Sequence, residues 1–254
     1  MIIWDKFKDS FKILRNSYKL LWIGIITEIL FFIVWGFLSS PFIVAMETNL
    51  VYLGDEVISS NSPDIAGIMS QSGYLNKIIF LGVMLLLISF LMYVVFHGFL
   101  WKFSFNLKDK KKGYFNYIKK FLLVNLFWLP FFIIYFLINF LFSYMDIVAK
   151  RFNPEGLFIF GQVTNIILLI ILYFAFLSYV LIDKNKIWTS IKKSFAIGFR
   201  KSILLMYILM AAVFVIMNLI LTQLPQSLVI ILGVIVIVPF MILSRVFIRE
   251  VIQN

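Results

Sequence analysis

The sequence predicts an all-α integral membrane protein with six transmembrane helices arranged as three helical hairpins. Three observations lead to this fold class. Hydrophobic residues make up 63% of the chain and charged residues only 14%, whereas soluble domains are about 45–50% apolar and about 25% charged. The apolar residues gather in runs long enough to cross a bilayer core about 30 Å thick as helices. Lysine and arginine gather before the first run, between the second and third runs, and between the fourth and fifth.

The predicted spans follow one another in pairs. They are residues 20–38, 78–101, 121–145, 157–182, 203–221 and 227–248. Each hairpin and the basic amphipathic segment that leads into it form one unit, and the units are residues 1–101, 102–183 and 184–254. All three belong to a single membrane domain, 1–254. Pro130 lies inside the third span, where a membrane helix tolerates proline, so we expect a kink there.

The first hairpin begins with a segment whose apolar residues recur every three or four positions from Trp4 to Leu21. Lysines occupy its other faces, a pattern typical of a helix lying at a membrane surface. The alternative is that this helix extends the first span into the cytoplasm. We expect the span to end at Ser39-Ser40-Pro41, and a polar outer loop to follow over 40–77. Long loops are often functional, but a plain surface loop fits as well.

The placement of basic residues predicts the orientation. All lysines and arginines except Lys77, Lys150 and Arg151 lie before the first span, after the second or fourth, or at the end of the sixth. Because cytoplasmic loops are enriched in Lys and Arg, both termini are expected in the cytoplasm, and the chain in the cell membrane. These clusters are topology signals, with contact to anionic lipid head groups as an alternative. The basic and aromatic residues expected at the membrane surface are Trp4, Lys8, Lys12, Lys110, Lys111, Lys112, Trp188, Lys192 and Lys193.

An internal repeat supports the hairpin arrangement. The segment 187–197 resembles 3–13, because both contain Ile-Trp followed by a lysine and Ser-Phe at matched positions. The returning spans also end alike, in the segments 91–97, 177–183 and 243–249. Each hairpin begins and ends on the same side, so these are parallel repeats rather than inverted ones.

Three residues are candidates for binding. Glu28 is the only acid deep in a predicted span, and an ionisable residue there costs about 3 kcal/mol and is a functional candidate by default. A structural hydrogen bond between helices is an equal alternative. His97 lies near the cytoplasmic end of the second span and approaches Glu28 if the first two spans pair. Asn125 is more typical of helix packing than of a ligand site.

Several classes of site are excluded by composition. The chain has no Cys and a single His, so thiolate and multi-histidine metal sites are absent. No phosphate-binding glycine loop, nucleophile elbow or zinc protease motif occurs, and we expect no cofactor and no metal. The net charge of +11 is explained by the topology signals, so no nucleic-acid partner is expected.

The repeated segments around Ser10-Phe11 and Ser194-Phe195 resemble those of six-span prokaryotic membrane families of unknown function. They are also similar to the membrane domain that accompanies some glycerophosphodiester phosphodiesterases. That resemblance covers most of the chain in pattern. The phosphodiesterase catalytic domain has no counterpart here, so the resemblance implies a membrane module and no catalytic residues.

The sequence therefore predicts a non-enzymatic, transport-related or accessory membrane component that acts through lipid or an unidentified protein partner. One alternative is a stand-alone transporter or channel for a small solute or lipid, with Glu28 in its pathway. A lipid-modifying enzyme is the weakest alternative, because no intramembrane set of acid, base and nucleophile is visible.

Overall fold

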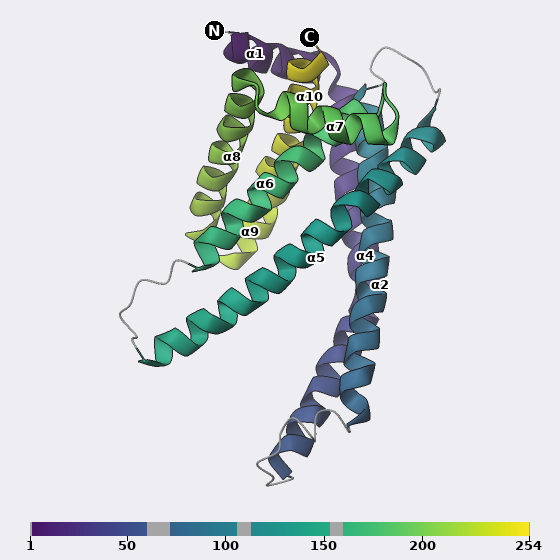
Figure 1. Ribbon diagram of the computed structural model, residues 1–254. Helices are drawn as coiled ribbons and strands as arrows, with labels where there is room; N and C mark the ends of the chain where they lie inside the picture. The colour runs from purple at the N-terminus through teal and green to yellow at the C-terminus, as the bar shows by residue number, and fades with distance from the viewer. Residues whose placement is uncertain (1, 60–71, 106–112, 153–159, 254) are drawn as a thin grey trace. The chain divides into compact units, whose positions relative to one another are not determined.

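The computed structural model describes residues 2–59, 72–105, 113–152 and 160–253, and within these ranges every element is a helix. The elements are α1 (Ile2–Asn16), α2 (Tyr18–Ser59), α4 (Gly73–Phe105), α5 (Tyr114–Phe152), α6 (Phe160–Leu181), α7 (Ile187–Gly198), α8 (Lys201–Thr222), α9 (Gln226–Leu232), the π-helix η1 (Gly233–Ile237) and α10 (Val238–Gln253). Figure 1 shows their course. The predicted all-α class is confirmed for the described residues.

Long apolar helices identify the protein as a multi-pass membrane protein. Helices that are long and apolar enough to cross a bilayer occur at Leu21–Ser59, Gly73–Ser104, Tyr114–Asn139, Thr164–Leu181 and Lys201–Thr222. In the apolar windows of the first two, only 6% of the residues are buried. Their side chains therefore face outward, where lipid rather than a protein core covers apolar surface.

The contacts divide the chain into two compact units. We call residues Ile26–His97 the hairpin unit, and residues Met1–Ile25 together with Gly98–Asn254 the bundle unit.

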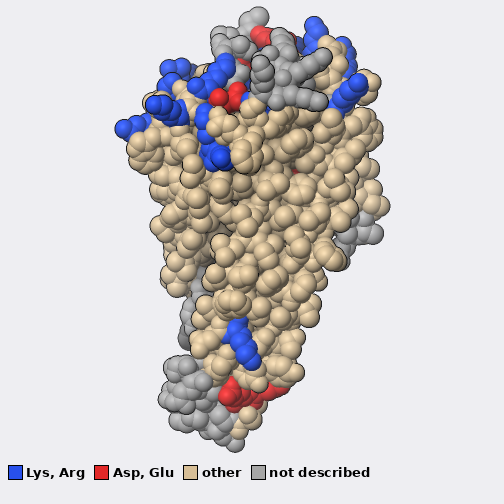
Figure 2. All heavy atoms as spheres, turned by 90° about the vertical axis from the view of Figure 1, so that its right-hand side faces the viewer, with Lys and Arg blue, Asp and Glu red and all other residues tan. Residues whose placement is uncertain are grey.

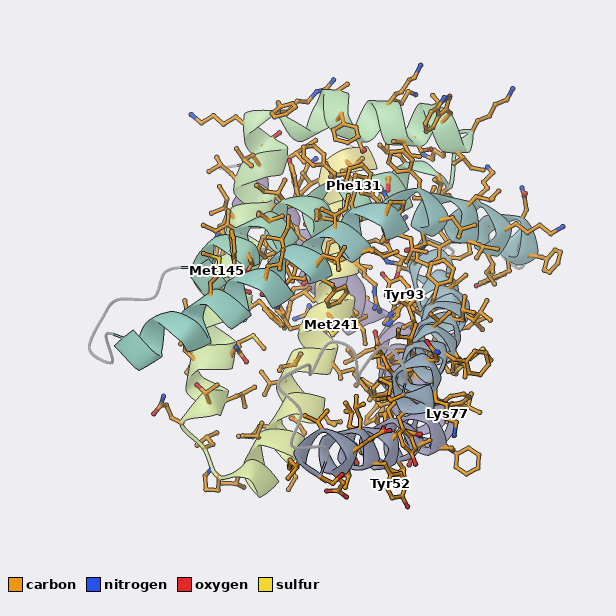
Figure 3. All side chains as sticks on the ribbon, turned by 60° about the horizontal axis from the view of Figure 1, so that its bottom comes forward. Tyr52, Lys77, Tyr93, Phe131, Met145 and Met241 are labelled. Carbon is orange, nitrogen blue, oxygen red and sulfur yellow. The ribbon has the colours of Figure 1, made fainter. Side chains whose placement is uncertain are left out.

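In the hairpin unit, α2 and α4 pair in antiparallel fashion. The Trp35 indole donates a hydrogen bond to the Ser89 hydroxyl, with Nε1 and Oγ 2.8 Å apart. Farther along, the rings of Tyr52 and Tyr74 lie 5.6 Å apart. Between these two contacts the chain advances 17 residues on α2, from Trp35 to Tyr52, and 15 on α4, from Ser89 to Tyr74. The two helices therefore stay side by side with nearly constant register. Figure 3 labels Tyr52 near the far end of the hairpin and Tyr93 closer to its base.

The expectation that the first helix ends at Ser39-Ser40-Pro41 is wrong, because α2 continues through Pro41 to Ser59. The predicted outer loop over 40–77 is therefore largely helical where it is described, and α4 begins as early as Gly73. Polar side chains do not interrupt α2 because they bond back to its own carbonyls. Thr48 donates to the carbonyl of Val44, and Asn49 to that of Ala45.

In the bundle unit, two short amphipathic helices pack on the ends of long ones. The helix α7 lies across α6 and α5, and α1 lies against the last turns of α10 (Figure 1). The α1–α10 contact is apolar, because Leu14 joins a buried cluster with Ile242 and Val246. The Lys6 ammonium also donates to the carbonyl of Glu250 near the end of α10, where unbonded carbonyls favour a cation.

Two further boundaries differ from expectation. The third helix does not end near residue 145, because α5 runs through Pro130 and on to Phe152. The predicted sixth span, 227–248, is not one uninterrupted α-helix. It is divided into α9, η1 and α10, with Gly233 starting the π-helical turn. The three segments follow one another without a break, so the π-helical turn is an insertion within one helical run.

Candidate functional site

The predicted candidates Glu28 and His97 lie together in the hairpin unit. Glu28 is on α2 and His97 on α4, and 3.6 Å separates Oε1 from Nδ1. The side chain of Glu28 is fully buried and that of His97 is 8% exposed. The distance is long for a hydrogen bond but short enough for an ion pair when the imidazole is protonated. The antiparallel register of α2 and α4 brings the two residues to the same level.

Aromatic rings enclose the histidine of this pair. The ring of Phe31, one turn after Glu28 on α2, lies 4.9 Å from the imidazole. The ring of Tyr93, one turn before His97 on α4, lies 4.5 Å from it. These rings exclude water from one side of the pair, which strengthens any electrostatic interaction between the carboxyl and imidazole groups.

Glu28 and His97 each adjoin a long uncharged stretch of their own helix. No charged residue lies between Glu28 and Glu47 on α2, and none lies between Lys77 and Lys102 on α4 apart from His97 itself. Figure 2 shows acidic side chains gathered near one end of the view, a basic patch beside them, and uncharged surface beyond that patch. The Glu28–His97 pair therefore places ionisable groups at one end of long uncharged stretches of α2 and α4.

The chemistry available to such a pair is proton exchange. A carboxylate with an imidazolium and a carboxylic acid with a neutral imidazole differ only in which group holds the proton. Both states are neutral as a pair, so neither leaves a single uncompensated charge in a low-dielectric site. Adding one proton would give the pair a net positive charge.

The third candidate, Asn125, is engaged in packing. It lies on α5 in the bundle unit and is 5% exposed. Its amide nitrogen donates to the carbonyl of Phe121 at 2.8 Å, and its amide oxygen accepts from the Tyr179 hydroxyl at 2.6 Å. One turn farther along α5, the Trp128 indole donates to the hydroxyl of Ser178 on α6. These bonds hold α5 and α6 together, so Asn125 serves the packing alternative.

A second polar cluster in the bundle unit was not predicted. The Lys102 ammonium lies 2.7 Å from the Asp183 carboxylate, which links the end of α4 to the end of α6. The Arg245 guanidinium of α10 lies over the ring of Trp101 at 6.0 Å. One turn later, Arg249 donates to the carbonyl of Ser104. The ends of α4, α6 and α10 are thereby joined by charged side chains.

A sequence signal for this cluster existed in the repeat. Asp183 and Arg249 occupy the matched final positions of the returning segments 177–183 and 243–249, and His97 holds that position in the first unit. Within the bundle unit, Asp183 and Arg249 both make contacts with the end of α4, to Lys102 and to the carbonyl of Ser104.

The predicted membrane-surface residues lie on α1 and α7 where they are described. Trp4 and Trp188 are exposed, and so are Lys8, Lys12, Lys192 and Lys193. The serines that follow each tryptophan at the matched repeat position, Ser10 and Ser194, are fully buried. Lys110, Lys111 and Lys112 lie outside the described residues.

Within the part of the chain that the structure describes, no group of three His, Cys, Asp or Glu side chains is placed to hold a metal ion. Comparison with protein-family models, with curated proteins and with solved structures gives no match. The fold and the site define a multi-pass helical membrane protein with a buried carboxyl–imidazole pair. The resemblance to the membrane domain of glycerophosphodiester phosphodiesterases stays a prediction.

Proposed function

We propose that this protein is a transport-related membrane component in which the Glu28–His97 pair is the protonatable element of a pathway across the bilayer. It has six spans in three hairpins, with both termini at the cytoplasmic face of the cell membrane. No catalytic role belongs to the proposal. The observation that carries it is the complete burial of the Glu28 carboxyl group beside an imidazole inside an apolar hairpin.

The contact between α1 and α10 supports an even number of spans. The ring of Phe7 packs edge-on against that of Phe247, 5.4 Å away, and Lys6 reaches the carbonyl of Glu250. The first and last helices therefore meet at one face of the membrane. Five helices are long enough to cross it as single elements. The sixth crossing falls to Gln226–Gln253, whose α9, η1 and α10 segments together have the required length.

The repeat is supported by matched environments in the bundle unit. In α1 and α7 the tryptophan is exposed, and the serine six residues later is fully buried. Each serine bonds to a carbonyl of its own helix: Ser10 to Lys6, and Ser194 to Ile191. Equivalent sequence positions thus have equivalent burial, as two copies of one unit require.

A transport role explains Glu28 better than a packing role does. A structural hydrogen bond between helices needs only a neutral side chain, such as the serine that bonds Trp35 in the same hairpin. An ionisable group at this depth costs about 3 kcal/mol more than an apolar one. Proton relays in membranes are built from acidic residues and histidine, and a buried Glu beside a His is such a set.

The test is proton flux through the purified chain in liposomes that contain a pH-sensitive dye. A potassium gradient with valinomycin sets the interior negative and drives protons inward. Wild-type protein should acidify the lumen faster than empty vesicles do. Glu28→Gln removes the proton acceptor and should lower the rate about tenfold or more, whereas Glu28→Asp should keep a measurable part of it.

The matched control is Glu47→Gln, which removes an exposed carboxylate from the same helix. Its flux should equal that of wild type. Two results contradict the proposal: a folded Glu28→Gln variant that conducts like wild type, or a wild-type rate no higher than that of empty vesicles. In the second case the stand-alone pathway is lost, and the accessory function below becomes the better account.

The accessory alternative is favoured by the outer part of the hairpin. Beyond Glu47, α2 exposes Leu50, Val51 and Ile58, and the Ile58 residue is 77% exposed. Apolar patches outside the bilayer often mark protein contacts. A photo-crosslinking residue at Ile58 should then capture one partner in stoichiometric amount, and a crosslinking residue at the lipid-level position Leu86 should not. Equal capture at both positions contradicts this alternative.

A further inference from the structure

The outward face of α1 combines aromatic and basic side chains, and Phe7 at the edge of this face also packs against Phe247 of α10. A groove of about 310 Å³ runs along this helix. Its lining is three aromatic and three basic side chains: Trp4, Phe7, Phe11, Lys8, Lys12 and Arg15. The acids of α1, Asp5 and Asp9, are not among them. The groove is thus cationic along one side and aromatic along the other.

Packing fixes the direction in which the groove faces. Ser10 is fully buried and Leu14 is 6% exposed, and Leu14 contacts the cluster of Ile242 and Val246 on α10. Positions 4, 8, 11 and 15 recur about once per helical turn, so they share a face that differs from the face of residues 10 and 14. Trp4 and Phe11 are 55% and 60% exposed on that face.

Two aromatic rings of α1 stack on each other, and a lysine ammonium lies over one of them. Trp4 and Phe7 stack with their centroids 5.6 Å apart. The Lys8 ammonium lies 5.6 Å from the centre of the Trp4 ring, where it is held by the ring's negative face. Lys8 thus lies at the aromatic floor of the groove, within reach of an anion that enters it.

The position of α1 in the chain decides which anion is presented to the groove. The helix ends at Asn16, and α2, the first helix long enough to cross the bilayer, begins at Tyr18. A groove this close to a membrane-crossing helix lies at the level of the lipid head groups. Exposed tryptophan and phenylalanine on a charged helix are typical of insertion into that layer.

We propose that the α1 groove is a binding site for one anionic phospholipid. The three cations contact the phosphate and the anionic head group, and the aromatic side chains cover the glycerol and the upper acyl chain. This site is separate from the Glu28–His97 pair and does not depend on the proposed transport role.

The test is native mass spectrometry of the full chain in detergent containing equal amounts of phosphatidylglycerol and phosphatidylcholine. Wild-type protein should retain phosphatidylglycerol in preference. The triple variant Lys8→Gln, Lys12→Gln and Arg15→Gln should lose that preference, by about fivefold for each cation removed. Trp4→Ala with Phe11→Ala should weaken retention of the same lipid while the head-group charges remain. All five side chains are exposed or at the surface, so the fold should persist.

The matched control removes three exposed cations elsewhere, as Lys184→Gln, Lys186→Gln and Arg200→Gln. It should keep the preference of wild type. If control and groove variants lose retention equally, the effect is general charge and the site is refuted. If inorganic phosphate at the same head-group concentration displaces the lipid fully, the groove binds a free anion, and the lipid proposal is wrong.

Discussion

The side-chain oxygen Oε1 of Glu28 lies 3.6 Å from the imidazole nitrogen Nδ1 of His97. The two side chains come from the two antiparallel helices of one hairpin, α2 and α4. Phe31 and Tyr93 cover the imidazole from the two helices. Removing one partner should destabilise the hairpin unit, because the buried group that remains loses a polar neighbour in a site largely closed to water.

Coupling between the two residues should be measurable as stability. His97→Leu leaves the Glu28 carboxyl without its imidazole and should lower the free energy of unfolding by about 3 kcal/mol, the range found for broken buried pairs. The double variant Glu28→Leu with His97→Leu should lose clearly less than the sum of the single changes. Unfolding in a denaturing detergent measures all three. Strict additivity would show that the residues do not act as a pair.

The Lys102–Asp183 ion pair should stabilise the bundle unit. Asp183→Asn removes the charge that faces the Lys102 ammonium at 2.7 Å and should cost about 2 kcal/mol, as for a hydrogen bond to a charged group. The control is Lys193→Gln, which breaks the exposed bond between Lys193 and Asn185 and should cost less than about 0.5 kcal/mol. Thermal unfolding in detergent compares them. A smaller loss for Asp183→Asn than for Lys193→Gln would refute a stabilising role.

The close approach of α7 to α6 makes Gly198 intolerant of a side chain. A Cβ atom there would lie 2.7 Å from the ring carbon Cε1 of Phe174 and 3.3 Å from Cδ1 of Leu177. Gly198→Ala should therefore lower stability by about 1–3 kcal/mol through overpacking. Gly36→Ala on α2 meets nothing within 4 Å and should gain up to about 1 kcal/mol from helix propensity. An unchanged melting temperature for Gly198→Ala would contradict this packing.

Sequence reasoning found the candidate pair because a lone carboxyl group in an apolar run is conspicuous, and because adjacent spans are expected to pair. It misplaced the end of α2 at Pro41 because a proline after two serines resembles a helix stop, and no local pattern shows that Thr48 and Asn49 bond back to the helix. Local rules do not include the packing of α2 against α4, which continues as far as Tyr52 and Tyr74.

The bundle unit shows the same limit in a different form. Lys102 and Arg245 were counted among topology signals, since basic residues at span ends normally face the cytoplasm. In the structure they are 8% and 6% exposed and join the ends of different helices. Sequence spacing puts Lys102 and Arg245 near predicted span ends, but the convergence of α4, α6 and α10 depends on contacts between residues far apart in the chain.

The six-span arrangement is tested most directly by the sidedness of single cysteines, because the chain contains none of its own. Lys8→Cys lies on α1, Gln253→Cys at the end of α10, and Tyr52→Cys on the outer part of α2. A membrane-impermeant maleimide applied to intact cells should label Tyr52→Cys, and it should label the other two only after permeabilisation. Labelling of Lys8→Cys and Gln253→Cys from opposite sides would mean an odd number of crossings and would contradict the arrangement.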